Sequence, residues 1–272
     1  MENKAIIFRM SVIDFHTHAF PDDLAGRAIS SLEAAANWKA VARGKVSELL
    51  ASMDNSDVDM SVVCAIATKP GQAKGILKWC KKIASDRIIP LPSVHPKDDR
   101  PDKWLARFAQ EGFHGIKMHP MYQEFSADEP ALDAVYHAAS ENGLLVVVHS
   151  GRDVAFGPDD DRAAPVRFRS VIDRFPKLRL VCTHMGGWRS WDEAAERLLG
   201  TDVFLETSFS MPELGGQRAA EMIRRHGVDR VLMGSDWPWN SQTAAIGDIT
   251  SLPLTDSEKQ KILWSNAARL LC

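Results

Sequence analysis

Short apolar runs recur along the whole chain, and each is followed by a loop and then by a segment of helical character. Most runs are continuous in β-branched and aliphatic residues, as is typical of parallel strands buried on both faces. The third run is the weakest, because Pro90 and Pro92 interrupt the hydrogen bonding of a sheet. The strands are expected at 12–15, 61–66, 88–94, 115–118, 144–148, 178–183, 203–207 and 230–234.

The segments between these runs predict helices. Asp102 after Pro101, and the capping-box pattern from Thr255 to Glu258, indicate helix starts. Glycines mark several expected helix ends, namely Gly112, Gly143, Gly200 and Gly227. The helices are expected at 24–36, 45–55, 72–85, 101–111, 130–142, 164–175, 190–200, 214–226 and near 255–271.

The alternation of strands and helices predicts the fold. Eight strand–helix units average about 34 residues each, which suits a (β/α)₈ TIM barrel formed as a single domain by residues 1–272. An open, doubly wound sheet is the alternative, but no Gly-x-Gly-x-x-Gly follows the first strand. Residues 1–10 are expected to be an N-terminal extension, because their apolar core is too short for a secretory signal.

Composition narrows the setting and the partners. A net charge of −3 without a basic cluster argues against a nucleic-acid partner. No stretch approaches 18 consecutive apolar residues, so no membrane span is expected. Four widely spaced cysteines, with Cys64 and Cys182 inside apolar runs, favour buried thiols and a reducing, cytoplasmic setting.

The first strand carries candidate chemistry. Residues two apart on a strand point the same way, so His16 and His18 are expected to project side by side, with Asp14 on the same face. Two imidazoles on one strand can chelate a zinc-type ion. One surface histidine and one core histidine would give the same pattern, so this pair alone decides nothing.

Histidines at the other strand ends decide between these interpretations. Six of the nine histidines fall where an expected strand ends, and Asp236 closes the eighth strand. The carboxyl ends of barrel strands meet at one face, where active sites of this fold lie. The six are His16, His18, His95, His119, His149 and His184.

These positions predict a metal site with an open coordination position. His16, His18, His149 and Asp236 are the expected ligands of one divalent ion, Zn²⁺ first and Mn²⁺ or another second. Such an ion lowers the pKa of bound water to about 7. Asp236 is also expected to move the proton, and His184 to hydrogen-bond the water or polarise the substrate.

Four motifs together resemble the signature of the amidohydrolase superfamily: His16-Thr17-His18, His149-Ser150-Gly151, 183–187 (THMGG) and 234–238 (GSDWP). More narrowly, they resemble the amidohydrolase-related branch that includes aminocarboxymuconate-semialdehyde decarboxylase and several lactonases. The resemblance spans nearly the whole chain. It implies a (β/α)₈ barrel, a single divalent site with the four ligands above, and His184 as a catalytic histidine.

Other residues are candidates for substrate binding. Lys117 and His119 share one face of the fourth strand, and we expect an unmodified Lys117 to bind an anionic substrate group. A carboxylated Lys117 that bridges two metals, as in some superfamily members, and a structural ion pair are the alternatives. Arg152 is expected to bind a substrate carboxylate, or else to pair with Asp153 on the surface. Trp237 is expected at the pocket wall, although the loop tryptophans could instead pack the loops or cover a homodimer face.

Three functions fit these residues. The first is a metal-dependent hydrolase that uses activated water on an ester, lactone or amide of a small organic acid. The second is a metal-dependent, non-oxidative decarboxylase of an aromatic or unsaturated carboxylic acid. The third, a non-catalytic metal-binding scaffold, is disfavoured by the retained His184 and Asp236.

Overall fold

The computed structural model describes residues 10–271, so the predicted N-terminal extension falls outside the described residues except for Met10. All eight predicted strands are present, and neighbouring strands pair in parallel in the orders β1-β2-β3 and β4-β5-β6-β7-β8. Their bounds are β1 (Ile13–Thr17), β2 (Met60–Cys64), β3 (Ile88–Leu91), β4 (Gly115–Met118), β5 (Leu145–Val148), β6 (Arg179–Cys182), β7 (Phe204–Glu206) and β8 (Val231–Leu232).

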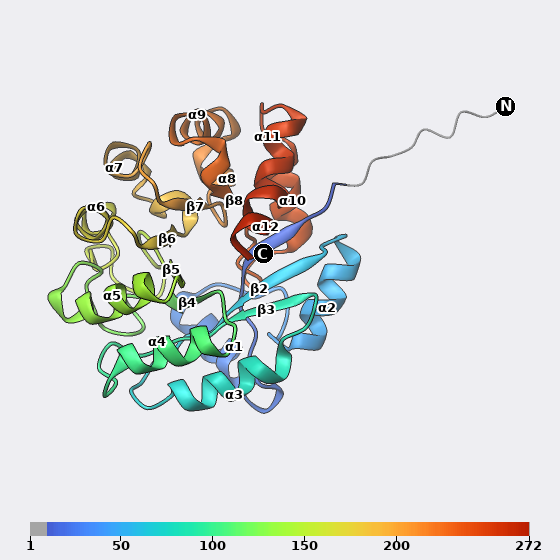
Figure 1. Cartoon of the computed structure of the whole chain (residues 1–272). Helices are drawn as coiled ribbons and strands as arrows, with labels where there is room; N and C mark the ends of the chain where they lie inside the picture. Colours follow the sequence, from blue (N-terminus) through green and yellow to red (C-terminus); the bar gives the residue numbers. More distant parts are fainter. Residues whose placement is uncertain (1–9, 272) are drawn as a thin grey trace.

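Backbone hydrogen bonds close the two sheets into a barrel. The Lys117 N–H donates to the Pro92 carbonyl (2.9 Å) between β3 and β4, and the Phe15 N–H donates to the Met233 carbonyl (2.9 Å) between β1 and β8. Pro90 lies within β3, and the strand ends at Leu91, before the second proline of the predicted run. The eight strands therefore form the predicted (β/α)₈ barrel (Figure 1).

Helices cover the outside of the barrel (Figure 1). The predicted capping box is present, because Thr255 Oγ1 accepts the Glu258 N–H (3.2 Å) and Glu258 Oε2 accepts the Thr255 N–H (2.7 Å). The main helices are α1 (Asp22–Ala36), α2 (Val46–Asn55), α3 (Ala73–Ile83), α4 (Pro101–Gln110), α5 (Asp133–Glu141), α6 (Pro165–Arg174), α7 (Trp191–Arg197), α8 (Met211–Leu214), α9 (Gly216–His226), α10 (Gln242–Thr250), α11 (Asp256–Gln260) and α12 (Asn266–Leu271). Short helical turns are η1 (Pro130–Leu132), η2 (His184–Gly186), η3 (Val228–Arg230) and η4 (Lys261–Ser265).

Each predicted helix overlaps an observed one, with two differences. The predicted helix 214–226 corresponds to α9, which begins at Gly216, and the short helix α8, which ends at Leu214, precedes it. Helix α10 was not predicted, because its residues include Gly247 and few large apolar side chains, which leaves no clear helical stripe. It packs against α2, α8 and η4 and supplies Gln242, whose contact with Asp14 is described below.

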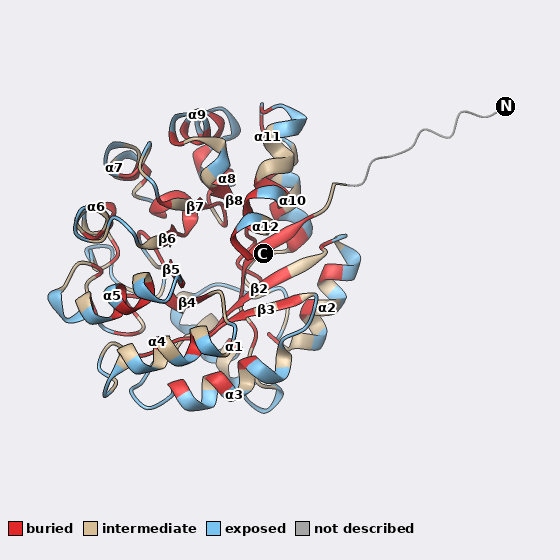
Figure 2. Ribbon diagram, in the orientation of Figure 1, coloured by how far each residue is buried: buried red, intermediate tan, exposed pale blue. Residues whose placement is uncertain are grey.

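Two buried layers position the strands (Figure 2). Inside the barrel, Phe15, Val62, Val147 and Leu232 belong to one cluster, to which α12 contributes Leu270. The strand residues of opposite parity, such as Val63, Ile116 and Val146, pack outward against the helices. Among residues 10–271, no helix is long and apolar enough to cross a membrane.

The loop tryptophans pack within this chain. Trp188, Trp191 and Trp237 are buried, and Trp191 Nε1 donates to the His184 carbonyl (3.0 Å). A homodimer was expected because loop tryptophans could cover its interface, but these three side chains are buried within the chain. The homodimer therefore stays a prediction.

Candidate active site

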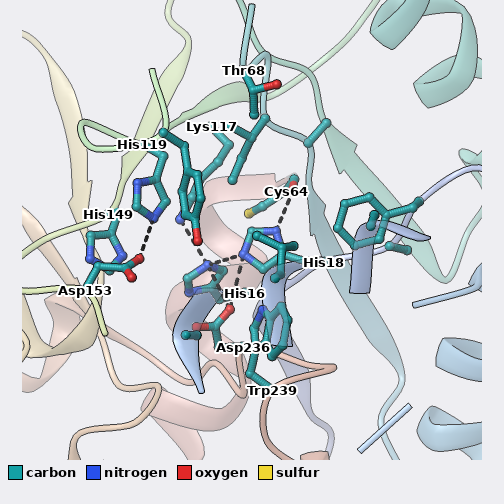
Figure 3. A pocket seen from close by; sticks show the side chains of 18 of the residues that line it. His16, His18, Cys64, Thr68, Lys117, His119, His149, Asp153, Asp236 and Trp239 are labelled. Carbon is teal, nitrogen blue, oxygen red and sulfur yellow. Dashed lines mark hydrogen bonds and ion pairs between the residues drawn. The ribbon is translucent and has the colours of Figure 1, made fainter. Parts of the chain in front are cut away.

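The junction between β1 and β8 brings three predicted metal ligands together. The Asp236 N–H donates to the His16 carbonyl (2.7 Å), and the His18 N–H donates to the Trp237 carbonyl (2.6 Å). The side chains then meet: His18 Nε2 lies 3.2 Å from His16 Nε2 and 3.2 Å from Asp236 Oδ1. Figure 3 shows these three side chains together. His16 and His18 lie far from Asp236 in the sequence, and they meet because β1 and the segment after β8 are neighbours in the closed barrel.

A β-bulge turns His16 into the barrel. The register of β1 against β2 shifts between Asp14 and Thr17, so Phe15 and His16 both face the interior. Strict alternation had placed Asp14 on the same face as His16, and this expectation was wrong. The buried Asp14 carboxylate instead accepts hydrogen bonds from Ser235 Oγ and from Gln242 Nε2 (2.8 Å) in the outer helix layer.

The hydrogen-bond partners of His16 and His18 leave their Nε2 lone pairs free for a cation. His18 Nδ1 donates to the Cys64 carbonyl (2.8 Å), and a carbonyl oxygen can only accept. His16 Nδ1 donates to Glu206 Oε2 (2.9 Å), which fixes the corresponding tautomer. Asp236 Oδ1, 3.6 Å from His16 Nε2, accepts no hydrogen bond from residues 10–271 although it is buried. Two Nε2 lone pairs and a carboxylate oxygen converge here, with Lys117 Nζ as a neighbouring donor 3.0 Å from His16 Nε2. Two imidazole nitrogens and a carboxylate oxygen are a donor set that fits a divalent cation.

Lys117 is the fourth group at this point. Its side chain is fully buried, yet it lines the cavity, and Nζ lies 3.0 Å from His16 Nε2 (Figure 3). Burial lowers the pKa of the Lys117 ammonium, while the nearby Asp236 and Glu206 oppose this shift. The structural ion pair considered from the sequence is not formed within 4 Å among residues 10–271, because Glu206, which faces the interior from β7, pairs with His16 Nδ1 (2.9 Å).

His184 and His149 form a second row beside the first. His184 Nε2 and His149 Nδ1 are 3.1 Å apart, and Ser208 Oγ lies 2.9 Å from His184 Nδ1. His149 Nε2 donates to the Arg152 carbonyl (3.1 Å), so both of its ring nitrogens are engaged. The structure therefore places His149 next to the group of His16, His18 and Asp236 but not within it.

His119, His149 and Asp153 form a third group of possible ligand atoms. His119 Nε2 lies 3.3 Å from Asp153 Oδ2, so Asp153 pairs with His119 (Figure 3). However, the His119 and His149 rings are stacked, 4.2 Å apart and 13° from parallel. Lone pairs in the planes of two parallel rings run side by side and do not converge on one ion. This group is better suited to binding a substrate than a metal.

The histidines lie at the floor of a cavity of about 740 Å³. Lys117, His119 and Arg152 line it, as expected for substrate-binding residues. Trp237 does not line the cavity, because its side chain is 1% exposed and packs in the core. Its neighbour Trp239 lines the cavity instead. The cavity also contains aromatic side chains that the sequence did not indicate: Trp38, Trp79, Tyr122 and Phe209.

Burial disfavours the charged form of four imidazoles of this site. It lowers the pKa of His16, His119 and His149 well below the ordinary value and that of His184 to about 4. For Asp236, burial opposes ionisation, but His16 and His18 outweigh it and hold the pKa well below the usual range. Neutral imidazoles beside an ionised carboxylate are the protonation states that metal binding requires.

The two predicted catalytic residues have unusual backbones. His184 and Asp236 have φ values of 56° and 60°, in the left-handed region that residues other than glycine rarely occupy. Such conformations persist when surrounding structure enforces them, and they cluster at functional sites. Here the Asp236 N–H bond to the His16 carbonyl helps to hold the turn.

Ser208 is the main polar residue that the sequence analysis missed. Its N–H donates to Glu206 Oε1 (2.5 Å) and its hydroxyl donates to Glu206 Oε2 (2.9 Å), so it orients the carboxylate that orients His16. The sequence could have indicated Ser208 by its position two residues after β7, because active sites of this fold form at that face of the barrel. The inward orientation of Glu206 depends on the register of β7, which the sequence does not give.

Comparisons with known proteins show the family of this chain. A family model described as "Amidohydrolase" matches residues 13–271. Gamma-resorcylate decarboxylase of Polaromonas sp. (strain JS666) is 27% identical over 119 residues, covering 37% of this chain and 36% of the relative. Its namesake from Rhizobium sp. (strain MTP-10005) is 23% identical over 192 residues, covering 60% and 59%. The matches thus span well under two thirds of these relatives.

Two solved structures share the fold. 5-Carboxyvanillate decarboxylase from Sphingomonas paucimobilis has a TM-score of 0.70 at 17% identity, covering 97% of this chain and 99% of that one. A dihydroxybenzoic acid decarboxylase from Polaromonas sp. JS666, with bound manganese and the inhibitor 2-nitroresorcinol, has a TM-score of 0.72 at 15% identity, covering 97% of both chains. At such identities the similarity shows the fold.

Proposed function

We propose that this chain catalyses the metal-dependent, non-oxidative decarboxylation of an aromatic or unsaturated carboxylic acid. The chain belongs to the amidohydrolase family of enzymes. The observation that carries the proposal is the convergence of His16 Nε2, His18 Nε2 and Asp236 Oδ1 at the floor of a cavity with largely apolar walls. Gamma-resorcylate decarboxylases among the sequence relatives support decarboxylation over hydrolysis.

His16, His18 and Asp236 would hold one divalent ion, with His149 as the nearest further candidate. The donor set suits Zn²⁺ or Mn²⁺, and the manganese-containing structural relative supports the latter. When bound, the ion supplies positive charge that stabilises negative charge on the substrate. The other roles belong to the chain's own residues.

Lys117 supplies a buried cation at the cavity wall, which can pair with a carboxylate or phenolate of the substrate. His119 and Arg152 lie farther along the cavity, where they can bind a second polar group. The apolar walls remove the acid from water. This disfavours a charged carboxylate relative to neutral carbon dioxide.

Decarboxylation breaks the bond between the carboxyl carbon and the substrate carbon. The electron pair stays on the substrate carbon, which must gain a proton as carbon dioxide leaves. Asp236 Oδ1 is the oxygen nearest His16 and His18, so Oδ2 is the oxygen that can take a proton from a substrate hydroxyl group and return it to this carbon. A carboxyl group whose pKa is depressed is a strong acid once protonated, which suits protonation of carbon. His184 lies in the next row and lines the same cavity, where it can orient the substrate.

Hydrolysis of an ester, lactone or amide is the second candidate. It is favoured by the family model, whose description is amidohydrolase, and it would use the same residues. The difference between the two functions lies in the products, so a single set of assays distinguishes them.

The test uses protein loaded with Mn²⁺ or Zn²⁺, with metal content measured by elemental analysis. Hydroxybenzoates and unsaturated acids are assayed for carbon dioxide release, and lactones and esters for hydrolysis. We expect carbon dioxide in equal amount to the acid consumed, and one solvent deuterium in the product in D₂O. Lactone hydrolysis alone would support the second candidate, and no turnover at full metal occupancy would contradict both.

Asp236→Asn should lower the rate by about 10²- to 10⁴-fold, as expected for loss of a proton-transfer group. Asp202→Asn is the matched control, since Asp202 is an exposed residue paired with Arg230. Metal content is measured for both variants, so that loss of the ion is separated from loss of proton transfer.

A further inference from the structure

Helix α1 has two apolar stripes and uses only one of them to cover the barrel. Ala25 and Ile29 are fully buried against the rest of the chain. Leu24, Ala28 and Leu32, spaced four residues apart, line the cavity instead. Since residues four apart lie on one face of a helix, the second stripe runs along α1 next to the first.

Helix α3 repeats this arrangement on the other side of the cavity. Leu77 and Cys80 are buried, whereas Gly75, Ile76 and Trp79 line the cavity. Side chains of α1 and of α3 line the same cavity. We call the part of the cavity lined by these two helices the apolar arm.

The apolar arm is uncharged and opens to solvent. Both helices carry several charged residues, but among the described residues of α1 and α3 none of the charged ones lines the cavity. At the rim, Leu24 is 41% and Trp38 is 40% exposed, so large apolar side chains face water beside an apolar channel. Exposed apolar surface continuous with a site is typical of a ligand-binding groove.

The volume of the cavity exceeds what one aromatic ring requires. At about 740 Å³ it lies within the range of roughly 300–1,000 Å³ of pockets that enclose whole drug-sized ligands. The polar groups gather at one end: His16, His18, Lys117 and Asp236 lie on the barrel strands and loops, whereas α1 and α3 contribute apolar side chains and Ser31 and Gln72.

We infer that the substrate is an amphiphilic carboxylic acid whose extended apolar substituent lies in the apolar arm between α1 and α3. The inference rests on the proposed function, since that function places the carboxyl group at the cavity floor. It adds a substrate class: an acid with an alkyl chain or a comparable apolar group beyond the ring or double bond. Burial of the substituent against Ile76, Trp79 and Leu32 supplies its affinity.

The experiment measures binding, which does not require turnover. Metal-loaded protein is titrated by calorimetry with 2-hydroxybenzoates that carry methyl, butyl or octyl chains, below their micelle concentrations. A buried methylene is worth roughly a fourfold gain in affinity. We expect the octyl acid to bind at least 100-fold more tightly than the methyl acid.

Gly75→Phe fills the apolar arm from α3. No atom of the described chain lies within 4 Å of the position that a Cβ at Gly75 would take, so the backbone can accept the side chain. We expect the octyl-to-methyl affinity ratio to fall at least tenfold. Gly26→Phe is the matched control: Gly26 also lies within a helix with open space around it, but it does not line the cavity, so the ratio should not change.

Ala28→Phe fills the arm from α1 and should lower the ratio as Gly75→Phe does. Equal affinity for the three acids, or a ratio that Gly75→Phe and Ala28→Phe leave unchanged in folded protein, would overturn the inference. Carbon dioxide release is followed in parallel. A chain-length dependence that both variants remove, without carbon dioxide release from any acid, supports the apolar arm and contradicts decarboxylation. If carbon dioxide is released but neither the affinity nor the rate depends on chain length, the result contradicts the apolar arm and leaves decarboxylation supported.

Discussion

Glu206 Oε2 lies 2.9 Å from His16 Nδ1, so β7 and β1 are joined inside the barrel by residues 190 positions apart. The carboxylate receives the Nδ1 proton and leaves the Nε2 lone pair of His16 facing Asp236 and His18. Burial raises the pKa of Glu206, while hydrogen bonds from Ser208 help to keep it ionised. The orientation of the candidate metal ligand therefore depends on a residue that does not itself face the metal.

Glu206→Gln should weaken metal binding. The glutamine amide can donate to His16 Nδ1, which would move the proton to Nε2 and remove the lone pair that faces the ion. Loss of such a supporting group costs roughly 10- to 100-fold in metal affinity. Competition with a chromophoric chelator measures the change, with Glu221→Gln on the exposed face of α9 as control. Equal affinities of the two variants would contradict this role of Glu206.

Gly234→Ala should disturb the same pair from β8. A Cβ at Gly234 would lie 2.1 Å from Glu206 Oε1 and 2.9 Å from the His16 Cβ, so Glu206 must move. We expect metal affinity to fall by roughly tenfold or more. Gly247→Ala is the control, because no atom of residues 10–271 lies within 4 Å of its Cβ position. In a Glu206→Ala background the same substitution should have a smaller effect, since the clashing carboxylate is gone.

Gly151→Ala should destabilise the fold around the candidate site. Gly151 has a φ of +92°, and a Cβ there would lie 2.1 Å from the Trp188 nitrogen. The surrounding backbone is held by the Trp188 N–H bond to the Ser150 carbonyl (2.9 Å), so it cannot shift without cost. We expect a loss of roughly 3 kcal/mol in the free energy of unfolding, measured in urea. Gly157→Ala, at a position with open space within the described chain, should stay within about 1 kcal/mol of the parent.

His226→Gln should reduce the loss of stability in acid. Burial lowers the pKa of His226 to about 4, against the hydrogen bond of Nε2 with the Val203 carbonyl (2.9 Å). The unfolded chain takes up the proton near pH 6.5, so this contribution to stability is present above that pH and is lost as the pH falls towards 4. The difference corresponds to about 3 kcal/mol.

Urea unfolding between pH 7 and pH 4 measures this effect. The stability of the parent relative to His226→Gln should fall by about 3 kcal/mol over that range. His137→Gln, at an exposed position of α5, is the control and should follow the parent. If the parent and His226→Gln lose stability in parallel, the buried imidazole has no part in acid unfolding.

Several elements were predictable because they depend on local patterns. The run Leu144 to Val148 can be satisfied only as a strand buried on both faces, and it forms β5. The capping box at Thr255 forms within one turn of chain and needs no distant partner. Helix α10 lacked such a pattern. Trp237 was expected at the pocket wall but lies in the core, because the choice between the two depends on the turn after β8.

The sequence by itself determined the barrel and the set of polar residues at the carboxyl ends of its strands. Continuous apolar runs that alternate with helical segments can be recognised locally, and closure of the barrel then brings the strand ends to one face. Tertiary structure alone decided the pairings at that face. A one-residue bulge turned His16 inward and Asp14 outward, the register of β7 aimed Glu206 at His16, and stacking on His119 placed His149 beside the first group. Each of these depends on contacts between segments far apart in the chain, and a shift of one residue in register would change which side chains meet.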